Sequence, residues 1–437
     1  MNISDKEFAS MFNKTLESTR IVKQQTMHTI EEENGVEGDT PYIFILNRIS
    51  GGIRAHFLSL HPHKGYILPH IQHVTWPKLK GWVDFRSAVY KNQLYLMGGK
   101  EKESGKYTSR MMKYDPAEDK WSNLCNLKKP KAYFTVNVVE RRIVITGGEI
   151  SSGEVSDVIE SYDPLIDAWS LEGHLPEPRK HHSSAVVNNR LYFCGGQGVG
   201  SSFNHNLWEL KRELKMVGEK ETFTHQWFHE WGHVFTRKIQ QSLLFEASGK
   251  LFSLGGLVQG PTEDGKRLLD ELDIDDPNSD SDEEEERKKQ RKTKPFVPSY
   301  LRMIAETSRQ KKRGPKNITR TTRRLASIDV GNNYLRHKNP YKAIADEKRM
   351  LQARAGGACM KVGKRIYVFG GYQMETDQLY LPRVDYYHIK RERWYSAFDL
   401  LTYDNESFRD IDVQLLQIPT ANQNFKVLTT AYKFPLW

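Results

Sequence analysis

In the chain of 437 residues, a pair of adjacent glycines follows a short apolar run six times. The first five pairs lie 47 to 60 residues apart, and the sixth follows after a longer interval. Self-similarity at such a period predicts a repeat architecture built from one small structural unit per repeat. The pairs are Gly51-Gly52, Gly98-Gly99, Gly147-Gly148, Gly195-Gly196, Gly255-Gly256 and Gly370-Gly371.

Other residue types keep step with the glycines. Arg179 lies as far ahead of Gly195 as Arg354 lies ahead of Gly370. A tyrosine and a tryptophan also recur at one fixed separation, and several offsets held at once are not a chance pattern. These pairs are Tyr114 and Trp121, Tyr162 and Trp169, and Tyr387 and Trp394.

The residue types within one repeat predict a β-hairpin that ends at the glycines. The run Ser184–Val187 is followed by a polar turn, and the apolar run Leu191–Cys194 leads into the glycine pair. Glycine permits close approach of chains where side chains would clash. The tyrosines and tryptophans are large enough to fill the space between neighbouring twisted sheets.

The strings Lys113–Trp121 and Ser161–Trp169 make the chain similar to the kelch-repeat family. This resemblance implies an all-β fold, a six-bladed kelch β-propeller. Within the family, the chain looks closest to the Kelch-like adaptors of ubiquitin ligases, in which BTB and BACK domains precede the propeller. About 40 residues precede the first repeat, which we expect to be too few for those two domains.

Composition and patterning divide the chain into four segments. Residues 1–36 carry a capping box and an apolar stripe, which predict a short helix. Residues 37–261 hold blades one to five, and residues 352–437 hold the last blade and a closing strand. Residues 262–351 are a charged insertion, which we expect to be disordered because like-charge blocks bury too little apolar surface to fold.

The insertion has two halves of opposite charge. Residues 262–286 contain 13 acidic and 2 basic residues (net −11), and residues 287–349 contain 20 basic and 4 acidic residues (net +16). The basic clusters suggest either a solvated spacer, a nuclear-targeting signal read by an importin, or a nucleic-acid contact. The candidate targeting residues are Arg287, Lys288, Lys289, Arg291, Lys292, Lys311, Lys312 and Arg313. Ser279 and Ser281 precede an acidic run and are candidate phosphorylation sites that would add charge beside these clusters.

The chain has the marks of an intracellular protein. Its three cysteines are odd in number and far apart, which favours a reducing compartment over a disulfide framework. The N-terminus lacks an apolar signal core, and no apolar run approaches the roughly 20 residues needed to cross a bilayer. We therefore expect no membrane contact and a location in the nucleus, or in the nucleus and cytoplasm.

No catalytic site is predicted. His229-Glu230-Trp231-Gly232-His233 matches the zinc-protease pattern, but that pattern works on a helix, and this segment lies in blade register between Trp227 and Arg237. Copper-oxidase propellers need a secreted setting and a crosslinked cysteine, which this sequence does not suggest. We expect a protein that is not an enzyme, with no metal and no cofactor.

The partner-binding surface is predicted from the resemblance to kelch adaptors, in which a basic residue at the start of each blade faces the ligand. This maps onto Lys131, Arg179, Lys180, His181, His182, Arg237, Lys238 and Arg354, while Trp82 departs from the pattern. Converging cations suit an acidic or phosphorylated protein segment. The alternative is that these cations cap blade loops internally. The predicted function is a protein-interaction scaffold or substrate-recognition adaptor, with a ubiquitin ligase as one setting, and nucleic-acid association through the insertion is the alternative.

Overall fold

A computed structural model gives the structure of the chain. It describes residues 40–49, 52–60, 67–76, 79–150, 153–201, 203–204, 206–217, 220–230, 239–260, 318–323, 325–330, 341–343, 349–374, 381–400, 408 and 411–418. The chain forms two compact units, of which the first comprises residues 1–257 and 321–437 and the second residues 258–320. The predicted N-terminal helix lies outside the described residues.

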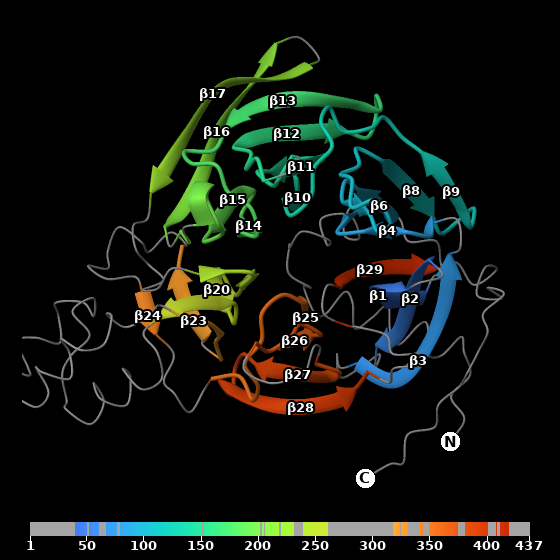
Figure 1. The fold of residues 1–437 in the computed structure, drawn as a ribbon, viewed down its shortest axis with the longest axis vertical. Helices are drawn as coiled ribbons and strands as arrows, with labels where there is room; N and C mark the ends of the chain where they lie inside the picture. Colours follow the sequence, from blue (N-terminus) through green and yellow to red (C-terminus); the bar gives the residue numbers. More distant parts are fainter. Residues whose placement is uncertain are drawn as a thin grey trace, which may run out of the picture. The chain divides into compact units, whose positions relative to one another are not determined.

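The first unit is built from four-stranded antiparallel sheets, which we call blades (Figure 1). Blade 1 contains β29 (Asp412–Ile418), β1 (Thr40–Ile49), β2 (Gly52–Leu60) and β3 (Ile67–Trp76). Blade 2 contains β5 (Arg86–Tyr90), β6 (Gln93–Met97), β8 (Met111–Asp115) and β9 (Lys120–Asn123). Blade 3 contains β10 (Thr135–Val139), β11 (Arg142–Thr146), β12 (Val158–Asp163) and β13 (Ala168–His174).

The remaining sheets follow in chain order. Blade 4 contains β14 (Ser183–Val187), β15 (Arg190–Cys194), β16 (Leu207–Val217) and β17 (Lys220–Glu230). Blade 5 contains β19 (Leu243–Ala247), β20 (Lys250–Leu254), β23 (Leu325–Asp329) and β24 (Tyr341–Ala343). Blade 6 contains β25 (Ala358–Val362), β26 (Arg365–Phe369), β27 (Arg383–His388) and β28 (Arg393–Asp399).

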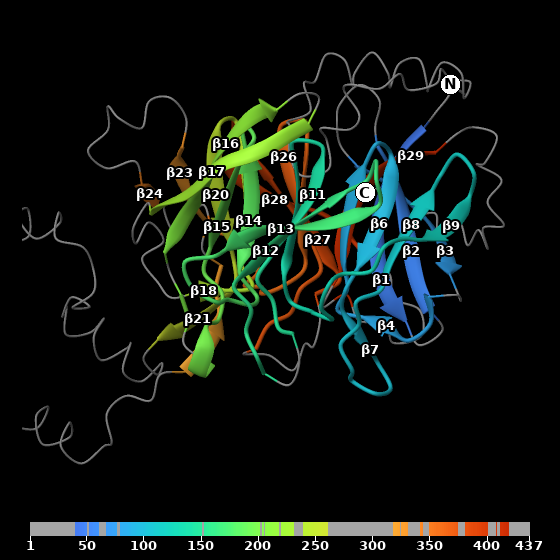
Figure 2. The ribbon, with the colours of Figure 1, turned by 90° about the horizontal axis from the view of Figure 1, so that it is seen from above.

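Short strands and a 3-10 helix connect the longer strands along the chain. Figure 2 shows the paired strands β4 and β7 at one face of the first unit. The short elements are β4 (Trp82–Val83), β7 (Lys100–Glu101), the 3-10 helix η2 (Val199–Ser201), β18 (Ile239–Gln240), β21 (Leu257–Gly260) and β22 (Ile318–Thr321).

The innermost strand of each sheet contacts the innermost strand of the next, in the closed order β29, β5, β10, β14, β19, β25 and back to β29. Five sheets take their strands in chain order, whereas blade 1 joins β29 from the end of the chain to β1, β2 and β3 from its beginning. Joining the two ends in one sheet closes the ring and leaves no free inner edge. The predicted all-β propeller is confirmed.

The glycine pairs hold neighbouring blades together. At Gly148 the backbone has a φ of 100°, and a Cβ there would lie 2.7 Å from the carbonyl oxygen of Ala132. The Gly148 amide donates a hydrogen bond of 2.9 Å to the carbonyl of Arg179, the residue that starts the next blade. Gly148 therefore has to be glycine for two reasons: its backbone has a positive φ, and Ala132 of the same blade approaches it closely.

The recurring tyrosine and tryptophan face each other across the two outer strands. Tyr114 lies opposite Trp121, and Tyr162 opposite Trp169, with ring centroids 5.2 and 5.3 Å apart. Tyr387 and Trp394 repeat the pair in blade 6 at 5.4 Å. These rings fill the gap between adjacent blades, as predicted from their size.

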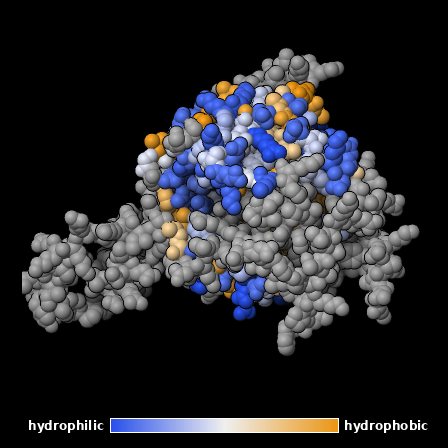
Figure 3. Space-filling model, turned by 45° about the vertical axis from the view of Figure 1, so that its right-hand side comes forward, coloured by the Kyte–Doolittle hydropathy of each residue, from blue (hydrophilic) through white to orange (hydrophobic). Residues whose placement is uncertain are grey.

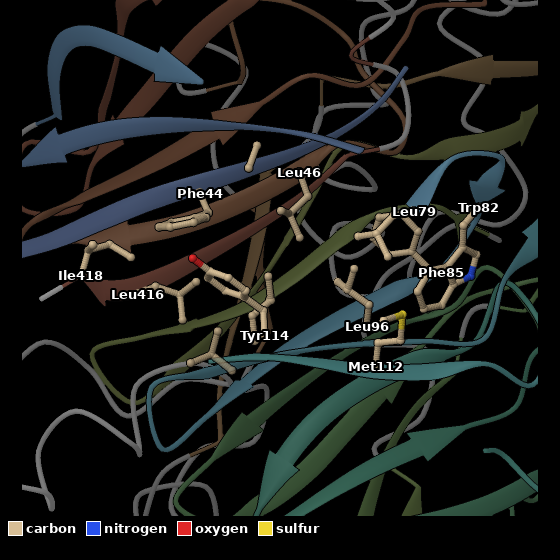
Figure 4. Close-up of a cluster of buried hydrophobic side chains, with 13 residues drawn as sticks. Phe44, Leu46, Leu79, Trp82, Phe85, Leu96, Met112, Tyr114, Leu416 and Ile418 are labelled. Atoms are coloured by element: carbon tan, nitrogen blue, oxygen red, sulfur yellow. The ribbon is translucent and has the colours of Figure 1, made fainter. Parts of the chain in front are cut away.

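Apolar side chains between blades 1 and 2 form one of the buried clusters (Figure 4). Phe44 and Leu416 come from opposite ends of the chain, and both pack near Tyr114 of blade 2. Figure 3 shows that the coloured part of one face is mostly hydrophilic, with small hydrophobic patches. Within the described residues, no helix is long and apolar enough to cross a membrane.

The structure corrects the C-terminal limit of the predicted insertion. Residues 325–329 form β23 and pair with β20 of blade 5, and residues 341–343 form β24, which pairs with β23. The segment Leu325–Asp329 contains three apolar residues, but it is short and directly follows the basic residues Arg323 and Arg324, which concealed it. The described part of the second unit consists of residues 258–260, in β21, and residues 318–320, in β22.

Candidate functional site

Three of the cations predicted to face a partner, Lys131, Arg179 and Arg354, are buried within their own blades. The guanidinium of Arg179 is fully buried, donates a 3.1 Å hydrogen bond to the carbonyl of Gly195 and lies 5.1 Å from the centroid of the Phe193 ring. Burial lowers the pKa of Arg179 to about 10. Arg179 therefore fastens its own blade and is not available to a partner.

Arg354 and Lys131 occupy the same internal position with acidic partners. Arg354 is 1% exposed, and its Nη2 donates to Asp385 at 2.9 Å while its Nη1 donates to the carbonyl of Gly370 at 2.9 Å. Lys131 is also 1% exposed, and its Nζ lies 2.5 Å from Glu160. The prediction that these side chains face a partner is corrected by their burial, and the alternative of internal capping describes them.

Trp82 takes the place of the arginine in blade 2. Its indole N–H donates a 2.6 Å hydrogen bond to the carbonyl of Gly98, sixteen residues further along the chain. Arg179 and Arg354 make their glycine contacts at the same offset of sixteen. Although Trp82 departs from the pattern, its indole therefore supplies the same hydrogen bond to the glycine carbonyl.

Blade 5 begins in a register that differs from the prediction. The Gly196 amide donates to the carbonyl of Ile239 at 2.8 Å, just as the Gly148 amide donates to Arg179. Ile239 therefore stands where Arg237 was expected. The offset from Trp227 misled the prediction because β16 and β17 are eleven residues long and contain a register shift. Arg237 and Lys238 lie outside the described residues.

The other three predicted residues, Lys180, His181 and His182, do not present free positive charges. Lys180 pairs with Glu149 at 2.9 Å. The His182 ring is buried against the hydroxyl of Thr146 at 2.9 Å. Burial lowers the pKa of His182 well below its ordinary value, and burial lowers that of His181 to about 3, so both rings are neutral at neutral pH. The predicted cationic face is therefore not a ring of free positive charge.

A cavity of about 250 Å³ lies where the inner strands of all six blades meet. One of its rims carries residues that stand two positions after each blade-start residue. Tyr133, His181 and Gln241 hold this position with φ of 60°, 54° and 54°. The His181 amide donates to the carbonyl of Tyr133 at 3.0 Å, and the Gln241 amide donates to that of His181 at 2.9 Å. Backbone hydrogen bonds that pass from blade to blade therefore fix this rim.

The rim continues through Asp84 of blade 2. The Tyr133 hydroxyl donates to Asp84 at 3.0 Å and accepts from the Lys100 ammonium at 2.9 Å. The Lys100 ammonium also lies 4.5 Å from the centroid of the Tyr107 ring. The Tyr133 and His181 rings are 4.3 Å apart. This mixture of aromatic faces, donors and acceptors is typical of a surface that recognises a polar chain segment.

Arg86 is a partly exposed cation that lines the cavity. Its side chain is 30% exposed; its Nε donates to the carbonyl of Phe134 at 3.1 Å, and its Nη1 lies 3.8 Å from Asp412. Lys361 also lines the cavity, and burial lowers its pKa while the charge of Glu246 opposes that shift. Hydroxyl and amide groups of Ser184 and other inner-strand residues complete a polar lining.

The cavity offers little for covalent catalysis. Burial raises the pKa of the Cys359 thiol to about 12, so this sulfur stays protonated at neutral pH. His229 and Glu230 lie on strand β17 and not on a helix, which removes the geometry that the zinc-protease pattern needs. Among the described residues, no three acidic, histidine or cysteine side chains are grouped as metal ligands.

The predicted partner-binding residues include His181 of this rim, but the predicted blade-start cations stand two positions before the rim residues. The prediction missed Asp84, Arg86, Gln241 and Asp412. The signal that would have found Asp84 was its position two residues after Trp82, which matches Tyr133 after Lys131. The candidate targeting and phosphorylation residues, between positions 279 and 313, lie outside the described residues.

Comparison with known proteins supports the propeller fold. Residues 84–257 match the model of the KLHDC2/KLHL20/DRC7 Kelch-repeats domain. Within residues 84–257 the propeller is therefore similar to a kelch-repeats domain. A solved structure of YjhT resembles this kelch propeller with a TM-score of 0.53 and 12% sequence identity, over 84% of this chain and 99% of YjhT. At that identity the likeness concerns the fold alone. No curated protein matched the chain.

Proposed function

We propose that the kelch propeller is a protein-interaction scaffold that binds a segment of a partner protein at the rim of the central cavity. The observation that carries this proposal is the rim itself, where Asp84, Tyr133, His181 and Gln241 come from four successive blades and border one polar cavity. Side chains presented by loops on a rigid scaffold are the common basis of recognition in such folds.

The narrower proposal is that the partner segment is acidic. Arg86 supports it, because this guanidinium is partly exposed within the cavity and lies only loosely beside Asp412. A carboxylate from the partner would form charge-assisted hydrogen bonds with Arg86 and with the neutral donors around it. Arg86 therefore replaces the buried cations Lys131, Arg179 and Arg354 as the residue expected to contact an acidic segment.

Selection from a random displayed-peptide library tests both levels of the proposal. We expect the intact chain to enrich peptides that contain Asp or Glu, and the Arg86→Ala variant to lose them. Lys120→Ala removes an exposed cation on outer strand β9 and serves as the control. If Arg86→Ala still enriches acidic peptides, the acidic-segment proposal is contradicted. If neither Tyr133→Ala nor His181→Ala changes the enriched peptides, the rim is not the binding surface.

Substrate recognition within a ubiquitin ligase is a narrower form of the scaffold proposal. It is supported by the resemblance of the blade strings at Lys113–Trp121 and Ser161–Trp169 to Kelch-like adaptors. Recovery of a cullin subunit with the intact chain, and its loss with rim variants that also lose the partner, would support it. A partner that is recovered without any ligase subunit would contradict it.

The nuclear role proposed from the basic clusters rests on the net charge of +16 between residues 287 and 349. Replacement of Arg287, Lys288 and Lys289 together with Lys311, Lys312 and Arg313 by alanine should move a fluorescent fusion out of the nucleus. An unchanged distribution would contradict this proposal without affecting the scaffold proposal.

A further inference from the structure

Blade 6 carries a turn whose charge is opposite to that of the matching turns in blades 2 and 3. The β8–β9 turn, residues 115–120, reads Asp-Pro-Ala-Glu-Asp-Lys, and the β12–β13 turn, residues 163–168, reads Asp-Pro-Leu-Ile-Asp-Ala. Both have a net charge of −2. The β27–β28 turn, residues 388–393, reads His-Ile-Lys-Arg-Glu-Arg and has a net charge of +2 with neutral histidine.

The fold does not require these cations. In blades 2 and 3 the first aspartate of the turn accepts a hydrogen bond from the backbone amide two residues later, at 2.9 Å for Asp115 and 3.0 Å for Asp163. In blade 6 the Nδ1 of His388 accepts instead from the Arg391 amide at 3.2 Å. The side-chain hydrogen bond in this turn is therefore accepted by the His388 ring, and the basic side chains that follow are not needed for it.

The basic side chains converge on one end of blade 6. Arg365 lies opposite His388 on β27, and His388 lies opposite Arg393 on β28. Lys364, Arg391 and Arg393 are exposed. Burial and the positive charges of Arg391, Arg365 and Lys364 lower the pKa of His388, which places these charges close together.

A row of tyrosines adjoins this row of cations. Tyr386 lies opposite Tyr395, and their rings are stacked at 5.2 Å with an interplanar angle of 16°. The Arg365 guanidinium lies 4.9 Å from the centroid of the Tyr386 ring. Arg365, Tyr386 and Tyr395 therefore form a continuous stack, and both tyrosines are partly exposed.

The facing tyrosines are not shared by the matching blades. In register, the positions of Tyr386 and Tyr395 correspond to the facing pair Lys113 and Ser122 in blade 2. In blade 3 the facing pair at this place is Ser161 and Ser170. Polar residues thus occupy these sites in blades 2 and 3, whereas in blade 6 Tyr386 packs against the core beside Tyr367, and the stack with Tyr395 is specific to this blade.

We propose that this end of blade 6 binds single-stranded nucleic acid through a surface formed by Lys364, Arg365, Tyr386, Arg391, Arg393 and Tyr395. A base would extend the stack at Tyr395, and the exposed cations would contact the phosphates on either side. An acidic peptide would use the cations alone, whereas a nucleic-acid strand would also use the exposed part of the aromatic stack.

Fluorescence anisotropy with a short labelled RNA strand and the full chain tests the proposal. The Tyr386→Ser/Tyr395→Ser variant introduces the residues of blade 3 and leaves the charge unchanged. We expect its affinity for the strand to fall about tenfold or more for each base that is no longer stacked. The basic insertion is present in every variant, so it adds the same background throughout.

A charge variant provides an independent measurement. Lys364→Ala/Arg391→Ala/Arg393→Ala should reduce the magnitude of the slope of log affinity against log salt by about 2, since three phosphate contacts are lost. Lys113→Ala/Lys120→Ala removes cations from the matching place in blade 2 and should leave the slope unchanged. Thermal unfolding midpoints identify any variant whose fold is impaired.

A strand with abasic sugars separates the proposed ligand from other polyanions. We expect the wild-type chain to prefer the base-bearing strand and the tyrosine variant to lose that preference. Equal binding of abasic and base-bearing strands by the wild-type chain would overturn the proposal, and so would competition by a phosphorylated peptide but not by unlabelled RNA. Wild-type affinity in both the tyrosine variant and the charge variant would overturn it as well.

Discussion

The ion pair between Arg354 and Asp385 gives a sharp test of whether the blade-start cations are structural. Both side chains are 1% exposed, and Arg354 also donates to the carbonyl of Gly370. Arg354→Ala leaves Asp385 buried without its counter-charge, a change that costs about 3–5 kcal/mol in comparable buried pairs. The lost bond to Gly370 costs about 1 kcal/mol. We therefore expect the free energy of unfolding to fall by roughly 4 kcal/mol or more.

Urea unfolding followed by tryptophan fluorescence measures this loss, and a double variant identifies its cause. In Arg354→Met/Asp385→Leu neither charge remains, so most of the stability should return, because apolar residues of similar size often replace a buried pair without loss. Arg383→Ala, which breaks the exposed pair with Asp399, should cost less than about 1 kcal/mol. Wild-type stability of Arg354→Ala, combined with loss of a bound partner, would refute the structural role and restore Arg354 to the binding surface.

Three further predictions follow from buried groups. Gly148→Ala should lower the thermal midpoint much more than Gly153→Ala, because both have positive φ but only a Cβ at 148 meets other atoms, the nearest at 2.7 Å; equal losses would contradict the packing argument. Burial lowers the pKa of His182, so as pH falls the unfolded chain binds this proton before the folded chain does, and stability should decline below about pH 6.5. Fluorescence-monitored stability should fall less steeply with decreasing pH in His182→Asn than in the wild-type chain. Parallel curves would contradict this assignment. A thiol reagent at pH 8 should modify exposed Cys125 rapidly and buried Cys194 only after unfolding, as mass spectrometry of the labelled peptides will show. Rapid labelling of Cys194 would contradict its burial.

The blade architecture could be predicted because its signals are local and repeated. Glycine pairs such as Gly147-Gly148 are needed wherever the backbone turns with positive φ against the next blade, so they recur with the blade. The facing pair Tyr162 and Trp169 recurs for a similar reason, since every gap between blades needs similar volume. Strand β23 escaped prediction because five residues, three of them apolar, are too few to stand out beside long charged runs.

The candidate site could be predicted only in part. A basic residue at a fixed offset, such as Arg179, looks the same in the sequence whether it faces solvent or the carbonyl of Gly195. Only the distances showed that Trp82 makes the equivalent contact and that Ile239 stands in the place expected for Arg237.

The sequence by itself determined the repeat, the hairpins and the aromatic filling of the blades, because these depend on residues close together in the chain. Only the tertiary structure decided which cations are buried and which side chains border the cavity. It also decided that the first and last strands share a sheet, with Thr40 opposite Ile418. The physical reason is that burial and ion pairing depend on which blade lies beside which, and the closed ring brings together residues separated by hundreds of positions.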